Sequence, residues 1–338
     1  GDDISAVLTP AELAARETDG KILQGRNDIV AANVYLGAAP IADALDQGAD
    51  VVVTGRVADS ALALGPLMHA FRWRDDDWDR LAAGTLAGHL LECGSQITGG
   101  YFADPPYKNV PGMAELGYPI AEIADSGEMI VTKPRASGGR VDRQTVIEQM
   151  LYEIHDPAAY LAPDVVLDIT AARVDEIGAD RIRVTGARGR PRPDTLKATV
   201  CIDGGVLGEA EISYAGPNAM ARARLAAEVI RERMAVRAPG LRIRADAIGV
   251  VSVLGDNTGV FAQASNNAPD DIRLRFAAQS DDTAQVELLL DEVEALYCAG
   301  PAGGSGVRRR MTPRLASASC LIERDRVAPH VVMLGGGA

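Results

Sequence analysis

The segment Gly88–Gly94 brings a histidine, a carboxylate and a thiol together at helical spacing. Side chains three and four residues apart share one face of a helix, so His89, Glu92 and Cys93 are predicted to converge. A histidine oriented by a carboxylate could act as a general acid or base, and a His–Cys pair could supply a nucleophile. We predict no metal here, because spacing alone is weak evidence for ligation. The structural alternative is a packed helix end with a hydrogen-bonded histidine and an inert cysteine.

A second cluster of polar residues follows the valines at 51–53. Chemistry on α/β folds sits where a buried parallel strand ends and its helix begins, and Thr54, Gly55, Arg56 and Asp59 are predicted to occupy such an end. Arg56 offers a bidentate fork for a carboxylate or phosphate, and Gly55 lets a ligand approach the backbone. Asp59 could serve as a base, orient Arg56 or cap a helix. The alternative is a purely structural Arg–Asp pair.

Three further segments carry glycines beside hydroxyls or cations, a pattern typical of backbone that holds a phosphate or an oxyanion. They supply the remaining residues predicted to bind substrate or phosphate: Thr98, Gly99, Gly100, Lys133, Ser137, Gly138, Gly139, Gly303 and Gly304. The structural alternatives are a helix terminator, a solvated loop and an interdomain connection. No segment matches the Walker A or dinucleotide fingerprints, which counts against an NAD- or ATP-dependent enzyme.

The elements that must position these residues alternate between strand and helix in the first half of the chain. We predict a strand at 29–35, a helix at 40–47, a buried strand at 50–54 and a helix from Asp59 or Ser60 to His69. A further helix over 78–93 is predicted to be broken near Gly84 or Gly88. Such alternation favours an α/β fold with a parallel or mixed sheet covered by helices.

The second half of the chain has a different pattern. Residues 163–213 contain short apolar runs separated by Gly, Asp and Pro, which indicates antiparallel strands. From residue 215 the order strand–helix–strand–strand–helix is typical of a ferredoxin-like split βαβ sandwich. We therefore predict an α/β domain at 1–160, a β-rich connecting segment at 161–214 and a smaller α+β domain at 215–338.

The composition and net charge of the chain argue against several classes of binding partner. The net charge of −13 over 338 residues leaves no basic footprint for nucleic acid and argues against anionic membrane surfaces. No stretch approaches the ~20 apolar residues of a membrane span. The four cysteines are far apart, which favours reduced thiols and a cytoplasmic location. Because residue 1 is Gly and the first methionine is Met68, we expect the first domain to lack its natural N-terminal part.

Taken together, these segments resemble the acyclic terpene utilisation (AtuA-like) family from near Gly1 to about Met333. The segments that carry the resemblance are 33–38 (NVYLGA), 53–59 (VTGRVAD), 88–93 (GHLLEC), 98–100 (TGG), Lys133 with 137–139 (SGG), and 300–304 (GPAGG). Members of this family occur in bacterial pathways that break down acyclic isoprenoids such as citronellol and geraniol as coenzyme A thioesters. The resemblance implies that context, and it assigns no catalytic residue.

We therefore predict an enzyme of acyclic isoprenoid or branched acyl-CoA catabolism that carries out a hydratase- or lyase-type step. Arg56 and Lys133 would hold the carboxylate or phosphate, glycine-loop amides would polarise the thioester carbonyl, and His89, tuned by Glu92, would move a proton. The predicted catalytic residues are His89, Glu92 and Asp59. These groups are predicted to surround one cleft with Thr54, Thr98 and Ser137.

The predicted partner is a small-molecule acyl-CoA or carboxylate, with no nucleic acid, no membrane and no required cofactor beyond the coenzyme A of the substrate. A homo-oligomer is compatible with the sequence. The alternative function is a non-catalytic subunit or scaffold of an acyl-CoA carboxylase-type system.

Overall fold

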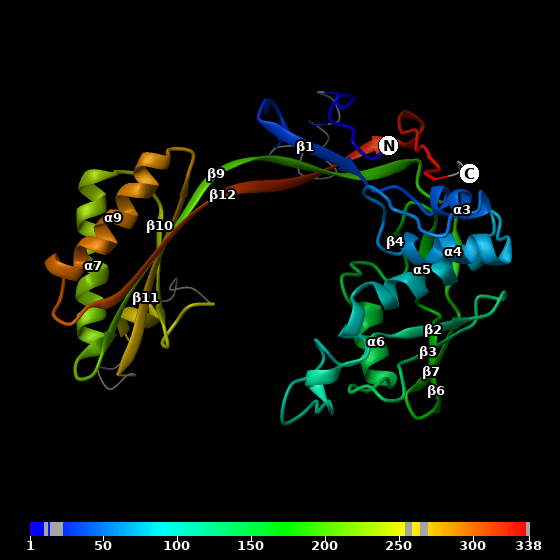
Figure 1. The fold of residues 1–338 in the computed structure, drawn as a ribbon, viewed down its shortest axis with the longest axis horizontal. Coiled ribbons are helices and arrows are strands. Elements are labelled where there is room, and N and C mark those ends of the chain that lie inside the picture. The colour runs from blue at the N-terminus through cyan, green and yellow to red at the C-terminus, as the bar shows by residue number, and fades with distance from the viewer. Residues whose placement is uncertain (10–12, 14–22, 254–258, 264–269, 336–338) are drawn as a thin grey trace. The chain divides into compact units, whose positions relative to one another are not determined.

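The computed structural model describes residues 1–9, 13, 23–253, 259–263 and 270–335 (Figure 1). The chain divides into two compact units. The first comprises Gly1–Asn27, Ala31–Val200 and Ala318–Ala338, and the second comprises Asp28–Val30 and Cys201–Ser317. Each unit has its own hydrophobic core, and the two cores share no residue.

The first unit is built around helix α5 (Trp78–Glu92), which is buried from Leu81 to Leu90 because this stretch is mostly alanine, leucine and glycine. The break predicted near Gly84 or Gly88 is wrong, since α5 is continuous through both glycines. Between residues 24 and 200, this unit also contains the α-helices α3 (Ala39–Asp46), α4 (Ala61–Phe71) and α6 (Arg143–Leu151). Helix α4 packs between α3 and α5, and α6 also contacts α5.

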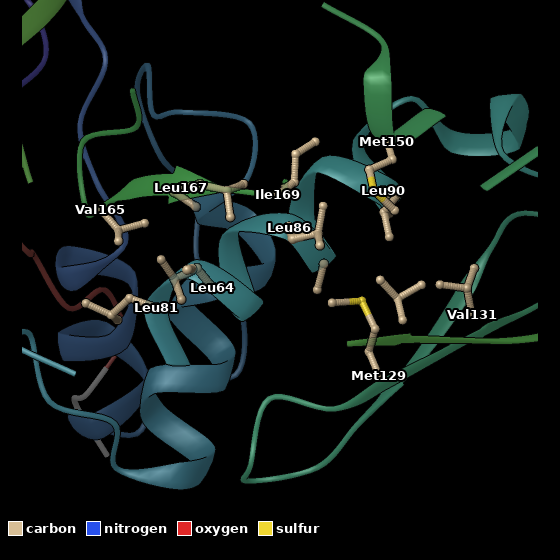
Figure 2. Close-up of a cluster of buried hydrophobic side chains, with 14 of the residues drawn as sticks. Leu64, Leu81, Leu86, Leu90, Met129, Val131, Met150, Val165, Leu167 and Ile169 are labelled. Atoms are coloured by element: carbon tan, nitrogen blue, oxygen red, sulfur yellow. The ribbon is translucent and has the colours of Figure 1, made fainter. Parts of the chain in front are cut away.

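The core of this unit joins its helices to its sheets. Figure 2 shows Leu64, Leu86 and Leu90, from α4 and α5, in one cluster with Met129 and Val131 of strand β3 (Met129–Thr132). Burying each such side chain contributes about 1.5–3 kcal/mol to stability. This packing fixes α5, and with it the polar residues at the end of α5.

Two antiparallel sheets complete the first unit, with strand orders β2-β3-β7-β6 and β4-β5-β8. Their other strands are β2 (Ile120–Ile123), β4 (Tyr160–Leu161), β5 (Val166–Asp168), β6 (Arg173–Gly178), β7 (Arg181–Thr185) and β8 (Arg188–Arg190). Every pairing within these two sheets is antiparallel. The mixed α/β class is therefore confirmed, while the parallel sheet is not found in the part of the chain that the structure describes. Parallel pairing is limited there to isolated bridges at Leu36–Val57 and Leu116–Gly138.

The buried strand predicted at 50–54 is also wrong. These residues form a bend and a loop, and Val51 and Val53 are 79% and 91% exposed. Valines favour strands only where a neighbouring strand and a core cover them. No described strand pairs with this segment, so Val51 and Val53 face outward, while Val52 packs against the core of this unit.

The second unit is an antiparallel sheet with two long helices, and its described part also includes one short helix. Its strand order is β12-β9-β11-β10, and helices α7 and α9 both pack on β11 (Figure 1). The elements are β9 (Thr195–Ala215), α7 (Ala219–Arg237), β10 (Ile243–Ile248), α8 (Val260–Gln263), β11 (Asp271–Ser280), α9 (Thr283–Ala299) and β12 (Ser305–Glu323). Ile272, Leu274 and Phe276 alternate along β11 and are buried in the same core as residues of both helices. That alternation is the sign of a sheet with one covered face.

Strands β9 and β12 are much longer than the usual 3–10 residues. They pair with each other, β1 (Ile29–Val34) also pairs with β9, and the division between the units falls inside all three. Short antiparallel strands separated by Gly, Asp and Pro were predicted across residues 163–213, and Gly204-Gly205 falls between two of the apolar runs. The chain instead continues as one strand, with Gly205 at a φ of +68°, a conformation that glycine adopts without a Cβ clash.

Candidate functional site

The side chains of His89 and Glu92 meet at the end of α5. They lie three residues apart on the helix, and His89 Nδ1 is 3.1 Å from Glu92 Oε1. The His89 side chain is 1% exposed and that of Glu92 is 15% exposed. The structure therefore has a buried imidazole whose carboxylate partner reaches toward solvent.

The other ring nitrogen of His89 differs from Nδ1 in its surroundings. Nε2 is buried and has no hydrogen-bond partner among the described residues. The centroid of the His89 ring lies 5.7 Å from that of the Tyr160 ring. The backbone carbonyl of His89 accepts a 3.1 Å hydrogen bond from Gln149 Nε2. An unpaired buried polar atom in a native structure calls for an explanation, and a catalytic role is one of the established ones.

Carboxylates set the electrostatic character around this pair. Burial, together with the negative charges of Glu92, Asp59 and Glu153, raises the pKa of Tyr160 to about 12. Burial also raises the pKa of the Cys93 thiol, and the same three carboxylates add to that effect. Tyr160 and Cys93 are therefore held protonated. Asp59, which was predicted as a catalytic residue, acts on the same groups as Glu92.

The loop from Thr54 to Ser60 is held in place by its backbone. The Leu36 amide donates to the Arg56 carbonyl at 3.3 Å, and the Ala58 amide donates to the Leu36 carbonyl at 2.8 Å. At its far end the loop lies against α5, where a Cβ on Gly88 would come within 2.5 Å of the Ser60 carbonyl oxygen. The loop thus connects Arg56 to the helix turn that carries His89. Ser60 is the N-cap residue that precedes α4, but its side chain makes no capping hydrogen bond.

Arg56 is exposed and contacts an aromatic ring as well as an acid. Its Nη1 lies 3.5 Å from Asp59 Oδ1, and its guanidinium carbon lies 5.0 Å from the centre of the Tyr35 ring. Lys197 Nζ lies 5.6 Å from the same ring centre. Two cations therefore share one tyrosine, an arrangement that attracts anions. Sequence reasoning missed Lys197 and Tyr160, which lie far along the chain from Arg56 and His89 and carry no local signal.

A carboxylate of the chain occupies the position beside Gly55 where a ligand anion was predicted. Asp2 Oδ2 accepts hydrogen bonds of 2.9 Å from the Arg56 amide and from Asn33 Nδ2. A Cβ on Gly55 would lie 2.1 Å from Asp2 Oδ1. The Arg56 amide is the main reason that the pKa of Asp2 is lowered. This backbone can hold an anion, and Thr54 stays exposed next to it.

The glycines predicted to bind phosphate between residues 98 and 139 pack against one another. The amides of Gly138, Gly139 and Arg140 donate to the carbonyls of Glu115, Pro111 and Thr98, respectively. Thr98 is fully buried, and its hydroxyl donates to the Gly117 carbonyl at 2.6 Å. The amide of Gly100 donates to the Ser95 carbonyl, and Gly99 adopts a φ of +111°. These segments meet, with their polar atoms turned toward each other.

Lys133 and Ser137 belong to the same meeting point. Lys133 is buried, and its Nζ donates to the Ser137 carbonyl at 3.0 Å and lies 3.5 Å from Asp180 Oδ2. The Ser137 hydroxyl donates to the Pro134 carbonyl at 2.8 Å. In this structure the polar groups of Lys133, Ser137 and the neighbouring glycines bond to other groups of the chain. Phosphate binding by these residues therefore stays a prediction.

Gly303 and Gly304 belong to the second unit. Arg222 donates to the Ala302 carbonyl at 2.8 Å, and a Cβ on Gly303 would come within 2.7 Å of Arg222 Nη1. Gly304 lies over Tyr214, whose hydroxyl is 3.1 Å from the position of a Cβ at Gly304. In this structure the two glycines allow close packing of the loop, and ligand binding by them is untested.

A cavity with a mixed polar and apolar lining, of about 690 Å³, opens beside the loop that carries Arg56, and Arg56, His89 and Glu92 are not part of its lining. It is lined by 49–55 and Val57, by residues of α3 and by 329–335. Val52, Ile41 and Leu334 represent its apolar lining, and Thr54 and Asp2 are among its polar groups. A volume in this range accommodates a small organic molecule.

Two further observations concern metal binding and membrane-spanning helices. No group of three or more His, Cys, Asp or Glu side chains suited to a metal ion occurs among the described residues. No helix in the same part of the chain has the length and apolar character needed to cross a membrane.

Comparison with known proteins gives one match. The family model described as "Acyclic terpene utilisation family protein AtuA" matches residues 1–333. Neither the curated proteins nor the solved structures give a match. Since the family model covers nearly the whole chain, the protein belongs to the acyclic terpene utilisation family, and this membership implies a role in acyclic terpene utilisation.

Proposed function

We propose that the protein is an enzyme that moves a proton on a branched acyl-CoA thioester or branched carboxylate, in a hydratase- or lyase-type step. The observation that carries this proposal is the state of His89. Its Nδ1 is held 3.1 Å from Glu92, while its buried Nε2 has no partner among the described residues. Leaving such an atom unpaired costs about 1–3 kcal/mol, which a site can recover when the atom exchanges a proton with substrate.

The cavity beside the Arg56 loop supports the substrate class. Its lining combines aliphatic side chains such as Ile41 and Val52 with Thr54 and the backbone of Gly55. A branched hydrocarbon chain would occupy the aliphatic part. Arg56 and Lys197, which share the Tyr35 ring, would attract the negatively charged end.

A hydratase step gives His89 two tasks. As the oxygen of water bonds to one carbon of the double bond, Nε2 takes a proton from that water. The same nitrogen then returns a proton to the neighbouring carbon, so that water is added across the double bond with no net change at the enzyme. Glu92 stabilises the imidazolium that forms between these events.

The test is turnover of branched enoyl-CoA thioesters, followed as the mass gain of one water. His89→Gln is expected to lower kcat by about 10²–10⁴-fold, the usual range for a lost general acid or base. Glu92→Gln is expected to lower kcat less, because the imidazole remains. His69→Gln is the matched control, since His69 of α4 also contacts a carboxylate, Asp46, but its side chain is 34% exposed, against 1% for His89.

A rate for His89→Gln equal to that of the native protein would contradict the proposal. An equal loss in His69→Gln would also contradict it, because the effect would then follow from any histidine–carboxylate contact in this unit.

The alternative function, a non-catalytic subunit or scaffold of an acyl-CoA carboxylase-type system, is favoured by one observation. Val53 and Leu334, which line the same cavity, are 91% and 90% exposed. Such side chains are typical of surfaces that contact another protein. Co-purification of a partner, with turnover only in its presence, would favour this alternative over the enzyme.

Three further points belong to the proposal. The second unit would be a ferredoxin-like sandwich, supported by its strand order β12-β9-β11-β10 and by the sequence order of its helices and strands. The protein would act in the cytoplasm, and it would form a homo-oligomer.

A further inference from the structure

The sheet of the second unit has an arginine-bearing face away from its helices. Leu274 and Phe276 of β11 are buried in the core shared with α7 and α9. Side chains alternate along a strand, so Arg275 and Ala277 lie on the opposite face. On β10, Asp246 and Arg244 pair directly with these two residues and therefore share that face.

A hollow of about 710 Å³ is lined by Arg244, Arg275 and Ala277 of this face and also by Arg231, which lies on α7. Four arginines line it, and no Asp or Glu is part of the lining: Arg231, Arg242, Arg244 and Arg275. Ala277 lies between Arg244 on one neighbouring strand and Glu209 on the other. Its short side chain leaves space between longer ones, which explains why a hollow forms here.

Two of these arginines are held in place by the buried carboxylate of Asp246. Arg244 Nε lies 2.9 Å from Asp246 Oδ1, and Arg275 Nη1 lies 2.8 Å from Asp246 Oδ2. The Asp246 side chain is 3% exposed, and Arg275 also pairs with Glu209. Guanidinium groups fixed before a ligand arrives lose little entropy when it binds.

The other two arginines are not held by a carboxylate of the described residues, although Glu228 lies three residues before Arg231 on α7. Arg231 and Arg242 are exposed and make no ion pair or hydrogen bond with any described residue. A cationic hollow is not expected from the chain as a whole, whose net charge is −13. Guanidinium groups bind phosphate oxygens through paired, charge-assisted hydrogen bonds.

We propose that this hollow binds a ligand that carries at least two phosphate groups, with Arg244 and Arg275 as fixed contacts and Arg231 and Arg242 as closing contacts. The volume lies within the range of small-molecule sites. The proposal does not rest on the catalytic role of His89. A diphosphate is present both in coenzyme A and in free nucleotides, and the test separates these sources.

The test is calorimetric titration of the full chain with pyrophosphate, with coenzyme A and with ADP. Arg231→Gln and Arg242→Gln are each expected to weaken pyrophosphate binding about tenfold or more, the usual effect of losing a charged hydrogen bond. Both side chains are exposed, so the fold should persist, and circular dichroism checks this. Arg308→Gln, on β12 of the same unit but outside the lining, is the control for charge alone.

Tighter binding of coenzyme A than of pyrophosphate or ADP would support the proposal and assign the ligand to the thioester substrate. ADP binding as tight as that of coenzyme A would support it and assign a free nucleotide. Absence of pyrophosphate binding would overturn the proposal. An equal loss of affinity in Arg308→Gln would also overturn it, because binding would then reflect diffuse surface charge.

Discussion

Cys93 lies one residue after Glu92, yet its chemistry differs from that of His89. A thiol attacks only as the thiolate. Burial and three neighbouring carboxylates raise the pKa of Cys93, although a hydrogen bond with Gln149 acts in the opposite direction. The His–Cys nucleophile is therefore the weaker interpretation of the 88–94 segment, and proton transfer by His89 is the stronger one.

This difference predicts how fast each cysteine is alkylated. At neutral pH iodoacetamide should modify Cys298, which is exposed, well before Cys93. The rate at Cys93 should rise only at a pH above the ordinary thiol range, because the raised pKa keeps the thiol protonated until then. Peptide mass spectrometry over a pH series measures both rates. Rapid modification of Cys93 at neutral pH would show an activated thiolate and restore the nucleophile interpretation.

At the scale of elements, the distance between α5 and the 54–60 loop decides where His89 and Arg56 lie. Gly88 is the contact point, since a Cβ there would come within 2.5 Å of the Ser60 carbonyl oxygen. Backbone atoms on both sides cannot turn away as a flexible side chain can. The loop must therefore shift if residue 88 acquires a side chain.

Gly88→Ala is accordingly expected to lower the free energy of unfolding by about 1–3 kcal/mol through overpacking, despite the better helix propensity of alanine. Turnover should fall as well, because His89 is the next residue. Urea denaturation and the enoyl-CoA assay measure the two effects. Gly84→Ala on the same helix is the control, since its closest contact is the end of the Leu64 side chain, which can move. Equal losses in both variants would show that the Ser60 contact has no special role.

Local spacing explains which parts of this arrangement the sequence could predict. The helix around 78–92 and the meeting of His89 with Glu92 depend on residues three apart, and both were predicted. Tyr160 and Lys197 reach the site through contacts between distant parts of the chain. No pattern within a single segment signals such contacts.

The strands show the same limit. The run Val51–Val53 has the composition of a buried strand, but composition does not say whether another strand will pair with it. Strand β9 continues through Gly204-Gly205, and it pairs with β12 and, from Val206 onward, with β11. The local turn signal therefore did not end the strand, whose partners are distant in sequence. In the second unit the helices α7 and α9 and the strands β10 and β11 follow the predicted order, whereas the short helix α8 and the long strand β12 were not predicted.

At the scale of the whole molecule, the chain holds two separate cores. Leu86 belongs to the core of the first unit and Leu289 to that of the second, and each is fully buried. The candidate proton-transfer pair lies in the first unit and the arginine-lined hollow in the second. Separate cores mean that each site depends first on the stability of its own unit.

Leu289→Ala should therefore destabilise the second unit by about 2–5 kcal/mol, the usual cost of a buried leucine truncated to alanine, and leave the first unit nearly unchanged. Hydrogen–deuterium exchange of the full chain, read by mass spectrometry, reports on each element. Exchange is expected to accelerate in α7, α9 and β11 but not in α5 or β3. Leu86→Ala should reverse this pattern, since its side chain packs in the other core.

Acceleration throughout the chain in both variants would show that β9 and β12, which run through the division, couple the units into one cooperative structure. A loss of pyrophosphate binding with retained turnover in Leu289→Ala would instead show that the two sites depend on different cores.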